Sequence, residues 1–333
     1  MSDGAQPTTI PIAKRVGLLS ILVLAIAALV AVIRFLPTPE HTNFWDVLYD
    51  TGHIPIFGLT TVFLLFGAAI LFGKRYLWRQ YLVTGLLALS IGIAVEVWQQ
   101  FLKDRSAEFL DVVNDVIGIV GFALLFAIVD ERITTPRRGW IKRGWLFLGA
   151  IVLLLLGCVP LFRISMLYAE RRAALPTLLE FRDSWNQKFF YLDYSELEIT
   201  APPEDWPSSR ATDVVGKLTL KPSFYAGIVV HEPFPDWTGY DQLELDVLYE
   251  DATARQFTVR VHDREHNNDV KDRFRKGFLI QPGFQTIRIP LEEIQNGSPL
   301  RKIDLKHVSG LSLYTPGLKQ SKTIYVGNVR LTK

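Results

Sequence analysis

Long apolar stretches without a charged residue occupy much of the first half of the chain and limit what it can fold into. Residues 16–33, 54–72 and 144–162 run for 18, 19 and 19 residues without Asp, Glu, Lys or Arg. A helix needs about 20 mainly apolar residues to cross a hydrocarbon layer of roughly 30 Å. These three stretches therefore predict membrane-spanning helices.

Two further stretches, residues 80–102 and 110–129, are long enough to span but are polar toward one end. Their polar side chains are Glu96, Gln99, Gln100, Asp111, Asn114 and Asp115. We interpret both as spanning helices, which gives five in all. A cleavable signal peptide is the alternative for the first stretch of the chain. Its length, the lack of a small-residue cleavage site before Pro37 and the spans that follow favour an uncleaved helix.

The composition supports a membrane protein with a soluble part. The 333 residues are 49% hydrophobic and 21% charged, which is too apolar for an ordinary soluble enzyme. The single cysteine, Cys158, excludes an intramolecular disulfide. A net charge of +2 gives no sign of a nucleic-acid-binding protein.

The distribution of Lys and Arg predicts the orientation, because positively charged loops stay in the cytoplasm. With a cytoplasmic N-terminus, the inner segments carry ten Lys and Arg residues and the outer segments six. We therefore expect a cytoplasmic segment 1–15 and a five-helix transmembrane domain 16–168. A juxtamembrane linker 169–183 and an extracytoplasmic β-sandwich 184–333 follow. This organisation predicts a multi-pass protein of the cytoplasmic (inner) membrane.

Polar residues at the outer ends of the second, third and fourth spans are the first candidate site. A charge inside a bilayer costs several kcal/mol unless it is paired or hydrated, so such residues indicate function. Residues three or four apart share one face of a helix, which groups Glu96 with Gln99 or Gln100 and Asp111 with Asn114 or Asp115. The predicted intramembrane cluster is His53, Glu96, Gln99, Gln100, Arg105, Asp111, Asn114 and Asp115.

Residues from about 50 to 128 resemble the VanZ-like family of small bacterial membrane proteins. The residues that carry the resemblance are Asp50, His53, Glu96, Gln99, Arg105, Asp111, Asn114, Asp115, Gly118 and Gly121. The chain departs from the family at Thr51, where the family often has Lys. The resemblance implies a helical membrane domain and a link to glycopeptide-antibiotic resistance. It implies an architecture more than a reaction.

Three interpretations of the cluster remain open. The side chains could neutralise one another and fix the helix order. They could form a shallow outward-facing pocket for a lipid head group or a lipid-linked cell-envelope precursor. Arg105 and His53 would then donate to phosphate, and Glu96 and Asp111 would accept from sugar or peptide donors. They could also catalyse a reaction, with His53 or Glu96 as general base.

The second half alternates apolar and polar residues, which is typical of half-buried strands. Residues 243–249, 257–262 and 287–291 show this most clearly. Further candidate strands are residues 189–200, 217–221, 226–230, 311–314 and 323–331. Eight or nine strands without a long helix predict an all-β jelly-roll sandwich.

This half resembles carbohydrate-binding modules and galactose-binding-like domains. The segments that carry the resemblance are residues 236–240, 282–291 and 324–329. The richest supply of groups for sugar hydroxyls is a polar segment after the strand 257–262. The candidates are His262, Asp263, His266, Asn267, Asp269, Asp272 and Arg273. The alternative is a solvated loop anchored by a buried Asp–Arg pair. We expect no metal and no cofactor.

We therefore predict a bacterial protein that binds cell-envelope glycan, or its lipid-linked precursor, through a non-catalytic sandwich. Its expected partners are membrane lipid or lipid-linked glycan, polysaccharide and cell-envelope biosynthesis proteins, with no nucleic acid. One alternative is an integral-membrane enzyme acting on a polyprenyl-phosphate or phospholipid. The other is a structural or assembly protein whose sandwich binds another protein. The second half lacks a G-x-S-x-G or P-loop motif, which favours a non-enzymatic role.

Overall fold

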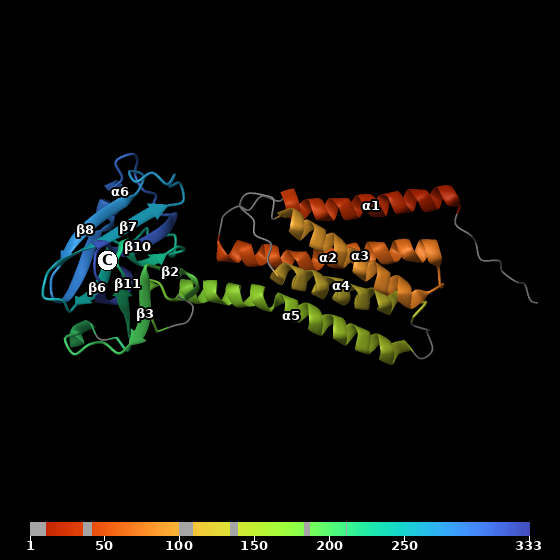
Figure 1. Cartoon of the computed structure of the whole chain (residues 1–333), viewed down its shortest axis with the longest axis horizontal. Coiled ribbons are helices and arrows are strands. Elements are labelled where there is room, and N and C mark those ends of the chain that lie inside the picture. Colours follow the sequence, from red (N-terminus) through yellow and green to blue (C-terminus); the bar gives the residue numbers. More distant parts are fainter. Residues whose placement is uncertain (1–10, 36–41, 100–108, 134–138, 183–186, 211) are drawn as a thin grey trace, which may run out of the picture. The chain divides into compact units, whose positions relative to one another are not determined.

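The chain forms two compact units, a helical unit Met1–Ser165 and a mainly β unit Met166–Lys333. A computed structural model describes residues 11–35, 42–99, 109–133, 139–182, 187–210 and 212–333 (Figure 1).

The helical unit contains long apolar helices that run up and down beside one another (Figure 1). They are α1 (Ile12–Phe35), α2 (Asn43–Phe72), α3 (Leu77–Gln99), α4 (Phe109–Val129) and α5 (Gly139–Ala173), whose last residues belong to the β unit. All five are long and apolar enough to cross a membrane, judged by length and composition. This includes the two stretches with polar ends, because their apolar windows are long enough despite those ends.

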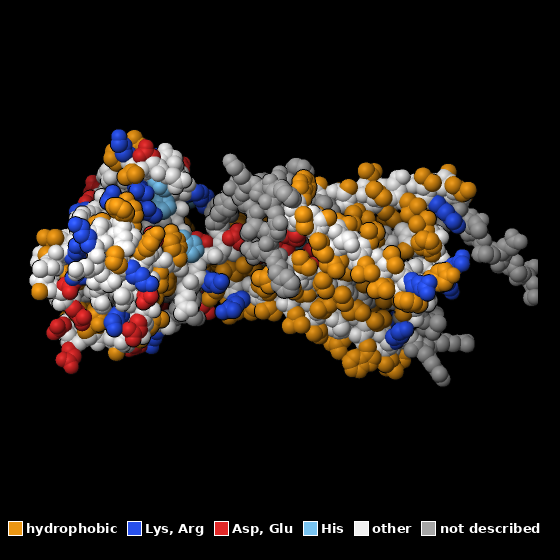
Figure 2. Space-filling model, in the orientation of Figure 1, with side chains coloured by type: hydrophobic (Ala, Val, Ile, Leu, Met, Phe, Trp, Pro, Cys, Tyr) orange, Lys and Arg blue, Asp and Glu red, His pale blue; other side chains and the backbone are white. Residues whose placement is uncertain are grey.

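The surface of the helical unit is mainly apolar. None of the most apolar window of α1 is buried inside the unit, and only 11% of that of α5 is. Figure 2 shows hydrophobic side chains over the length of the helices, with Lys and Arg gathered at one end. A soluble protein rarely exposes apolar area on this scale, because its transfer from water is so favourable.

Small residues let α2 and α4 approach each other closely. A Cβ added at Gly118 of α4 would lie 2.2 Å from the backbone oxygen of Ile54 in α2. A Cβ at Gly58 of α2 would meet the ring of Phe122 at 2.3 Å. Close backbone approach through small residues is a common way for helices to associate in membranes. This contact brings the start of α4 beside His53 of α2.

The β unit is a sandwich of two antiparallel sheets. The six-stranded sheet has the order β3-β4-β11-β6-β9, and β1 pairs with β11. Its strands are β1 (Thr177–Leu179), β3 (Ser195–Thr200), β4 (Val215–Leu220), β6 (Gln242–Tyr249), β9 (Gly283–Pro290) and β11 (Lys322–Thr332). The five-stranded sheet has the order β2-β5-β10-β7-β8. Its strands are β2 (Phe190–Asp193), β5 (Ser223–Val230), β7 (Arg255–Asp263), β8 (Phe274–Ile280) and β10 (Val308–Leu318).

Alternate residues of each sheet fill the space between them. Leu245 of β6, Val259 of β7 and Leu313 of β10 are fully buried and belong to one hydrophobic core. Trp237 is also fully buried, and its indole nitrogen donates to the backbone oxygen of Phe234 at 2.7 Å. Since successive side chains of a strand point to opposite faces, the neighbours of the core residues face outward.

The expected combination of long apolar helices with an antiparallel sandwich is present, but several details differ from the sequence-based expectation. Residues 189–200 form two strands, β2 and β3, which lie in different sheets on either side of Tyr194 with φ of 43°. Strand β8 was not predicted, because Arg275, Lys276 and Gly277 interrupt its apolar pattern. The expected linker 169–183 includes the end of α5 and the strand β1. Residues 291–296, partly expected as strand, form a short helix, α6 (Leu291–Asn296).

Candidate functional site

The outward side of the five-stranded sheet carries a row of polar and aromatic side chains. Strand register places Tyr191 of β2, Val229 of β5, Ser312 of β10, Arg260 of β7 and Arg275 of β8 directly across from one another. Leu313 and Val259 next to this row point into the core, so the row itself faces outward. We call this side of the sheet the sheet face, made of Tyr191, Asp193, Tyr225, Thr258, Arg260, His262, Arg275, Ser312 and Tyr314.

Tyrosines flank the polar row. Tyr191 is 52% exposed and Tyr225 is 51% exposed, whereas Tyr314 is buried against Tyr225. The rings of Tyr225 and Tyr314 meet edge to face with centroids 5.4 Å apart. Exposed aromatic rings beside polar groups suit a sugar, whose C–H face packs on a ring while its hydroxyls bond to polar atoms.

Several polar atoms of the sheet face are buried without a hydrogen-bond partner among the described residues. They are Thr258 Oγ1, Arg260 Nε, His262 Nδ1 and Ser312 Oγ, joined by Arg273 Nε from the segment before β8. The Thr258 and Ser312 side chains are almost fully buried, at 1% and 2% exposure. An unsatisfied buried polar group costs about 1–3 kcal/mol. Such a set in one place indicates a surface whose partners are supplied by a ligand or by water.

Burial and the neighbouring Arg260 lower the pKa of His262 to about 4. The imidazole is therefore neutral near pH 7, with one nitrogen that donates and one that accepts. Burial followed by the charge of Arg273 also lowers the pKa of Arg260. Arg273 thus lies close to both residues, and the positive charge of this region comes from arginine.

The predicted polar segment after β7 divides into two groups. Asp263 accepts two bonds from Arg301, at 2.6 Å from Nη1 and 2.5 Å from Nη2. Asp272 forms an ion pair with Arg301 Nε at 2.7 Å. Both carboxylates are almost fully buried. They form the buried Asp–Arg anchor that was the alternative interpretation of this loop.

Three other predicted residues hold the loop in shape. His266 Nδ1 lies 2.7 Å from the backbone oxygen of Asp272, and the backbone N–H of Asn267 donates to Asp272 Oδ2 at 3.0 Å. Asp269 Oδ1 accepts from the backbone N–H of Lys271 at 2.8 Å. Of the seven predicted carbohydrate-binding residues, His262 and Arg273 are the two with buried, unpartnered nitrogens near the sheet face.

Sequence reasoning did not single out Thr258, Arg260 or Ser312. The strand 257–262 was predicted, and its alternation already implies that Thr258, Arg260 and His262 share one face. Ser312 lies more than 50 residues further along the chain, and only the pairing of β7 with β10 places it opposite Arg260. The sequence therefore indicated the part of the site on β7 but not the part on β10.

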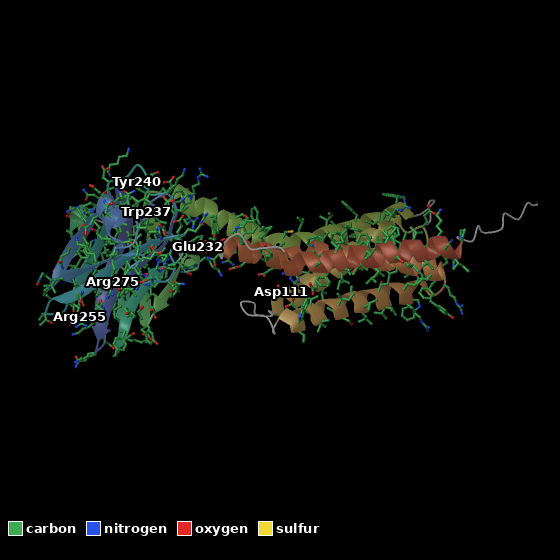
Figure 3. All side chains as sticks on the ribbon, turned by 90° about the horizontal axis from the view of Figure 1, so that it is seen from above. Asp111, Glu232, Trp237, Tyr240, Arg255 and Arg275 are labelled. Carbon is green, nitrogen blue, oxygen red and sulfur yellow. The ribbon has the colours of Figure 1, made fainter. Side chains whose placement is uncertain are left out.

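The predicted intramembrane cluster is assembled from three helices. His53 of α2, Glu96 of α3, and Asp111 and Asp115 of α4 are all buried. His53 Nδ1 lies 2.9 Å from Asp115 Oδ1 and 3.9 Å from Glu96 Oε1. Asp111 is marked in Figure 3, at the start of α4. A buried histidine between carboxylates is held in one orientation by its shortest bond, here that to Asp115.

The remaining members of the predicted cluster are only partly described. The Asn114 side chain donates from Nδ2 to the backbone oxygen of Asp50 at 3.0 Å, so it ties α4 to α2. Gln99 is the last residue of α3. Gln100 and Arg105 lie outside the described residues.

His53, Glu96 and Asp111 could together hold a metal ion. Each offers one ligand atom, and these atoms lie within 4.8 Å of one another. One imidazole nitrogen and two carboxylate oxygens suit a divalent transition metal or zinc. The same groups could also accept hydrogen bonds from a polar head group or transfer a proton.

The outward side of the six-stranded sheet holds a second polar cluster, which is internally paired. A cavity of 370 Å³ is lined there by Trp206, Arg210, Glu244, Asp246 and Arg330, among others. Glu244 accepts from Arg210 at 3.1 Å, from Arg288 at 2.7 Å and from Arg330 at 2.9 Å. These charged groups pair with one another, so they leave fewer unpaired polar atoms for a ligand than the sheet face does.

Comparison with known proteins gives structural likenesses only. No protein-family model matches the chain, and no curated protein matches its sequence. A structure of an exo-beta-agarase is similar over 47% of this chain and 24% of its own, with 18% identity and a TM-score of 0.38. A family 11 carbohydrate-binding module from Clostridium thermocellum, in complex with a β-1,3-1,4-mixed-linked tetrasaccharide, is similar over 47% of this chain and 94% of its own, with 16% identity and a TM-score of 0.35. A family 30 carbohydrate-binding module of a Clostridium thermocellum cellulosomal cellulase covers 47% of this chain and 96% of its own, with 11% identity and a TM-score of 0.34.

These likenesses concern the fold alone, so we argue function from the side chains of this chain. This chain spans about a quarter of the agarase. The resemblance of residues 50–128 to the VanZ-like family stays a prediction, because no family model matches.

The Asp–Arg anchor predicts a pH-dependent contribution to stability. Burial raises the pKa of Asp263 and of Asp272, but bonds from Arg301 and from backbone N–H groups outweigh it and hold both below their ordinary value. A carboxylate whose pKa is lower in the folded than in the unfolded protein stabilises the fold at pH values above the unfolded-state pKa of about 4. This stabilisation is lost as the pH falls through the folded-state pKa. We expect Arg301→Met to lower the Tm of the β unit by roughly 5 °C at pH 7, and by much less at pH 3.

Thermal unfolding of the purified full-length protein, followed by tryptophan fluorescence at both pH values, measures this difference. Lys302→Met, at the exposed neighbouring position, is the matched control and is expected to leave the Tm unchanged. An equal Tm loss at pH 3 and pH 7 would contradict the ionic origin of the stabilisation.

Proposed function

We propose that this chain is a multi-pass bacterial membrane protein that binds a glycan on the sheet face of its β unit. The observation that carries the proposal is the set of buried, unpartnered polar atoms of Thr258, Arg260 and Ser312 beside exposed tyrosines. Hydroxyl, guanidinium and imidazole groups together offer the donors and acceptors that sugar hydroxyls need. Tyr191 and Tyr225 offer the apolar surface that orients the ring.

The sheet face also argues against the other functions that the sequence left open. An assembly surface for another protein would be expected to centre on an apolar patch with a polar rim. Here the middle of the face is polar, and exposed tyrosines lie on the side of β2 and β5, which suits a hydroxylated ligand better. Within the described part of the face, the hydroxyls of Ser312 and Thr258 are not hydrogen-bonded to His262, so we propose binding without catalysis.

Charge and aromatic residues support a membrane-spanning helical unit with a cytoplasmic N-terminus. Lys74 and Arg75 follow α2, and Arg132 follows α4, at the end of the helices where α3 and α5 begin. Trp78 of α3 and Trp140 and Trp145 of α5 are exposed at that same end. Basic residues mark the cytoplasmic side, and tryptophans are enriched at the membrane–water interface. Five spans would then place the β unit outside the cytoplasm.

Cysteine labelling tests this orientation. In a Cys158→Ala background, we expect Lys319→Cys, on the exposed turn after β10, to react with a membrane-impermeant thiol reagent on intact cells. We expect Lys74→Cys, after α2, to react only once the cytoplasmic membrane is permeabilised. If the organism has an outer membrane, it is permeabilised in both samples. The reverse labelling pattern would place the β unit in the cytoplasm and contradict the orientation.

Removal of an exposed tyrosine tests the glycan site. Full-length protein in lipid nanodiscs is applied to immobilised neutral and acidic bacterial and plant polysaccharides, and its retention is measured. We expect Tyr191→Ala to weaken binding about tenfold, because the ring contributes apolar contact worth about 1 kcal/mol or more. Phe224→Ala removes an aromatic side chain that is 82% exposed outside the sheet face and is expected to bind as wild type. Retention of no polysaccharide, or an equal loss in both variants, would contradict a glycan site on this face.

We also propose that the helical cluster binds the polar head of a lipid or lipid-linked envelope precursor, which is one of the three interpretations that the sequence left open. Its support is the burial of His53, Glu96, Asp111 and Asp115 from three helices at one level. Glu96→Gln keeps the size of the side chain and removes its charge. We expect this variant to fold and to lose retention of a polyprenyl-phosphate-linked sugar in a detergent-solubilised pull-down.

Gln80→Glu, a change of buried charge at the other end of α3, controls for general disturbance of the helical unit. Loss of folded Glu96→Gln protein would favour the interpretation in which the cluster only fixes the helix order. Retained binding without turnover of a substrate that the wild type consumes would favour the enzyme alternative.

A further inference from the structure

The sheet face holds more positive charge than the protein itself neutralises. Arg260, Arg273 and Arg275 form no ion pair with any of the described residues. Five other arginines of the sandwich are paired: Arg301 with Asp263 and Asp272, Arg182 with Asp213, and Arg210, Arg288 and Arg330 with Glu244. Arg255 of β7 donates instead to the backbone oxygens of Pro316 and Gly317.

The unpaired arginines are also close to one another. Arg260 of β7 lies directly opposite Arg275 of β8 in the sheet register, on the same face. Like charges directly opposite each other in a sheet are destabilising. Arg273 precedes Arg275 at the start of β8 and lies near enough to Arg260 to influence its titration. Figure 3 marks Arg275 in the β unit.

An acidic residue is present on the sheet face but does not neutralise this group. Asp193, at the end of β2, interacts weakly with Arg260 and forms no ion pair with it within the described residues. The strands β5 and β10 lie between β2 and β7, so two strands separate Asp193 from Arg260. Three guanidiniums against one distant carboxylate leave the Arg260 side of the face positive.

Buried hydroxyls next to these guanidiniums distinguish the surface from a simple anion site. Ser312 Oγ and Thr258 Oγ1 are buried and unpartnered, and Ser312 lies directly opposite Arg260. A guanidinium fork binds a carboxylate, sulfate or phosphate with two parallel hydrogen bonds. Hydroxyls and tyrosine rings at the same place bind neutral parts of a sugar. The combination matches a ligand that carries both acidic groups and neutral sugar groups.

We infer that the glycan bound on the sheet face is anionic, and that Arg260 and Arg273, with Arg275 at the edge, bind its acidic groups. This inference rests on the proposed function, because it names the class of glycan for the same site. The acidic group is a uronate carboxylate, a sulfate ester or a phosphate ester. All three present paired oxygens that accept hydrogen bonds from a guanidinium fork.

Matched pairs of polysaccharides test the inference with full-length protein in nanodiscs. Polygalacturonate is compared with its methyl ester, carrageenan with the same carrageenan after desulfation, and a polysaccharide that carries phosphate monoesters with the same polysaccharide after phosphatase treatment. We expect at least one charged member to bind about tenfold more tightly than its neutral partner, with an affinity that falls as salt is added. The pair that shows the difference identifies the carboxylate, sulfate or phosphate.

The outcomes distinguish a failure of this inference alone from a failure of the proposed function. If neutral members bind as well as their charged partners, the glycan site stands and its preference for anions is overturned. If no polysaccharide of any pair binds, both the site and the inference are overturned. If a charged member binds but Tyr191→Ala leaves its affinity unchanged, the binding surface is elsewhere and both are again overturned.

Variants of the arginines complete the test. We expect Arg260→Gln and Arg273→Gln each to weaken binding of the charged polysaccharide about tenfold, and Arg260→Lys, which keeps the charge but loses the fork, to weaken it less. Arg182→Gln is the control, since Arg182 is an exposed arginine paired with Asp213. A Tm equal to that of wild type shows that each variant is folded. Unchanged preference for the charged polysaccharide in both Gln variants would overturn the assignment.

Discussion

A polar atom that folding removes from water must find another hydrogen-bond partner, and this constraint shapes both units of the protein. In the helical unit, the His53 ring meets Asp115 at 2.9 Å, and the Asn114 amide meets the backbone of Asp50. In the β unit, Arg301 joins Asp263 and Asp272 and fixes the loop after β7. On the sheet face, four buried polar atoms close together in neighbouring strands have no such partner among the described residues. A group of this kind points to a ligand better than any pattern of apolar residues does.

The two outward sides of the sandwich differ in whether their arginines are paired with carboxylates. On the six-stranded sheet, three arginines surround Glu244 and leave a compensated surface. On the five-stranded sheet, Arg260 faces Arg275, with no carboxylate in ion-pair range among the described residues. The same residue type thus stabilises the fold on one sheet and stays available for binding on the other. A structural arginine is distinguished from a binding one by whether a carboxylate lies beside it, and not by how many arginines the sheet contains.

Local periodicity predicted the elements, but not the contacts between distant ones. The five apolar stretches predicted five long helices, because the length of a mainly apolar run depends only on neighbouring residues. Alternation predicted β7 and therefore the common face of Thr258, Arg260 and His262. It could not show that Arg301 pairs with Asp263 or that Ser312 lies opposite Arg260, since these contacts depend on strand order. Strand β8 was missed because its middle residues, Arg275 to Gly277, lack an apolar repeat.

The small net charge of the chain bears on how an anionic glycan would be recognised. A formal charge of +2 over 333 residues gives little long-range attraction for a polyanion. At physiological salt, charges are screened beyond roughly 8 Å, so the arginines of the sheet face act on a ligand only when it is in contact. Selectivity then depends on whether an acidic group reaches Arg260 while a sugar ring packs on Tyr191. A polymer that repeats this pairing along its length can compensate for weak binding at each unit by rebinding, which would suit the proposed membrane-held glycan receptor.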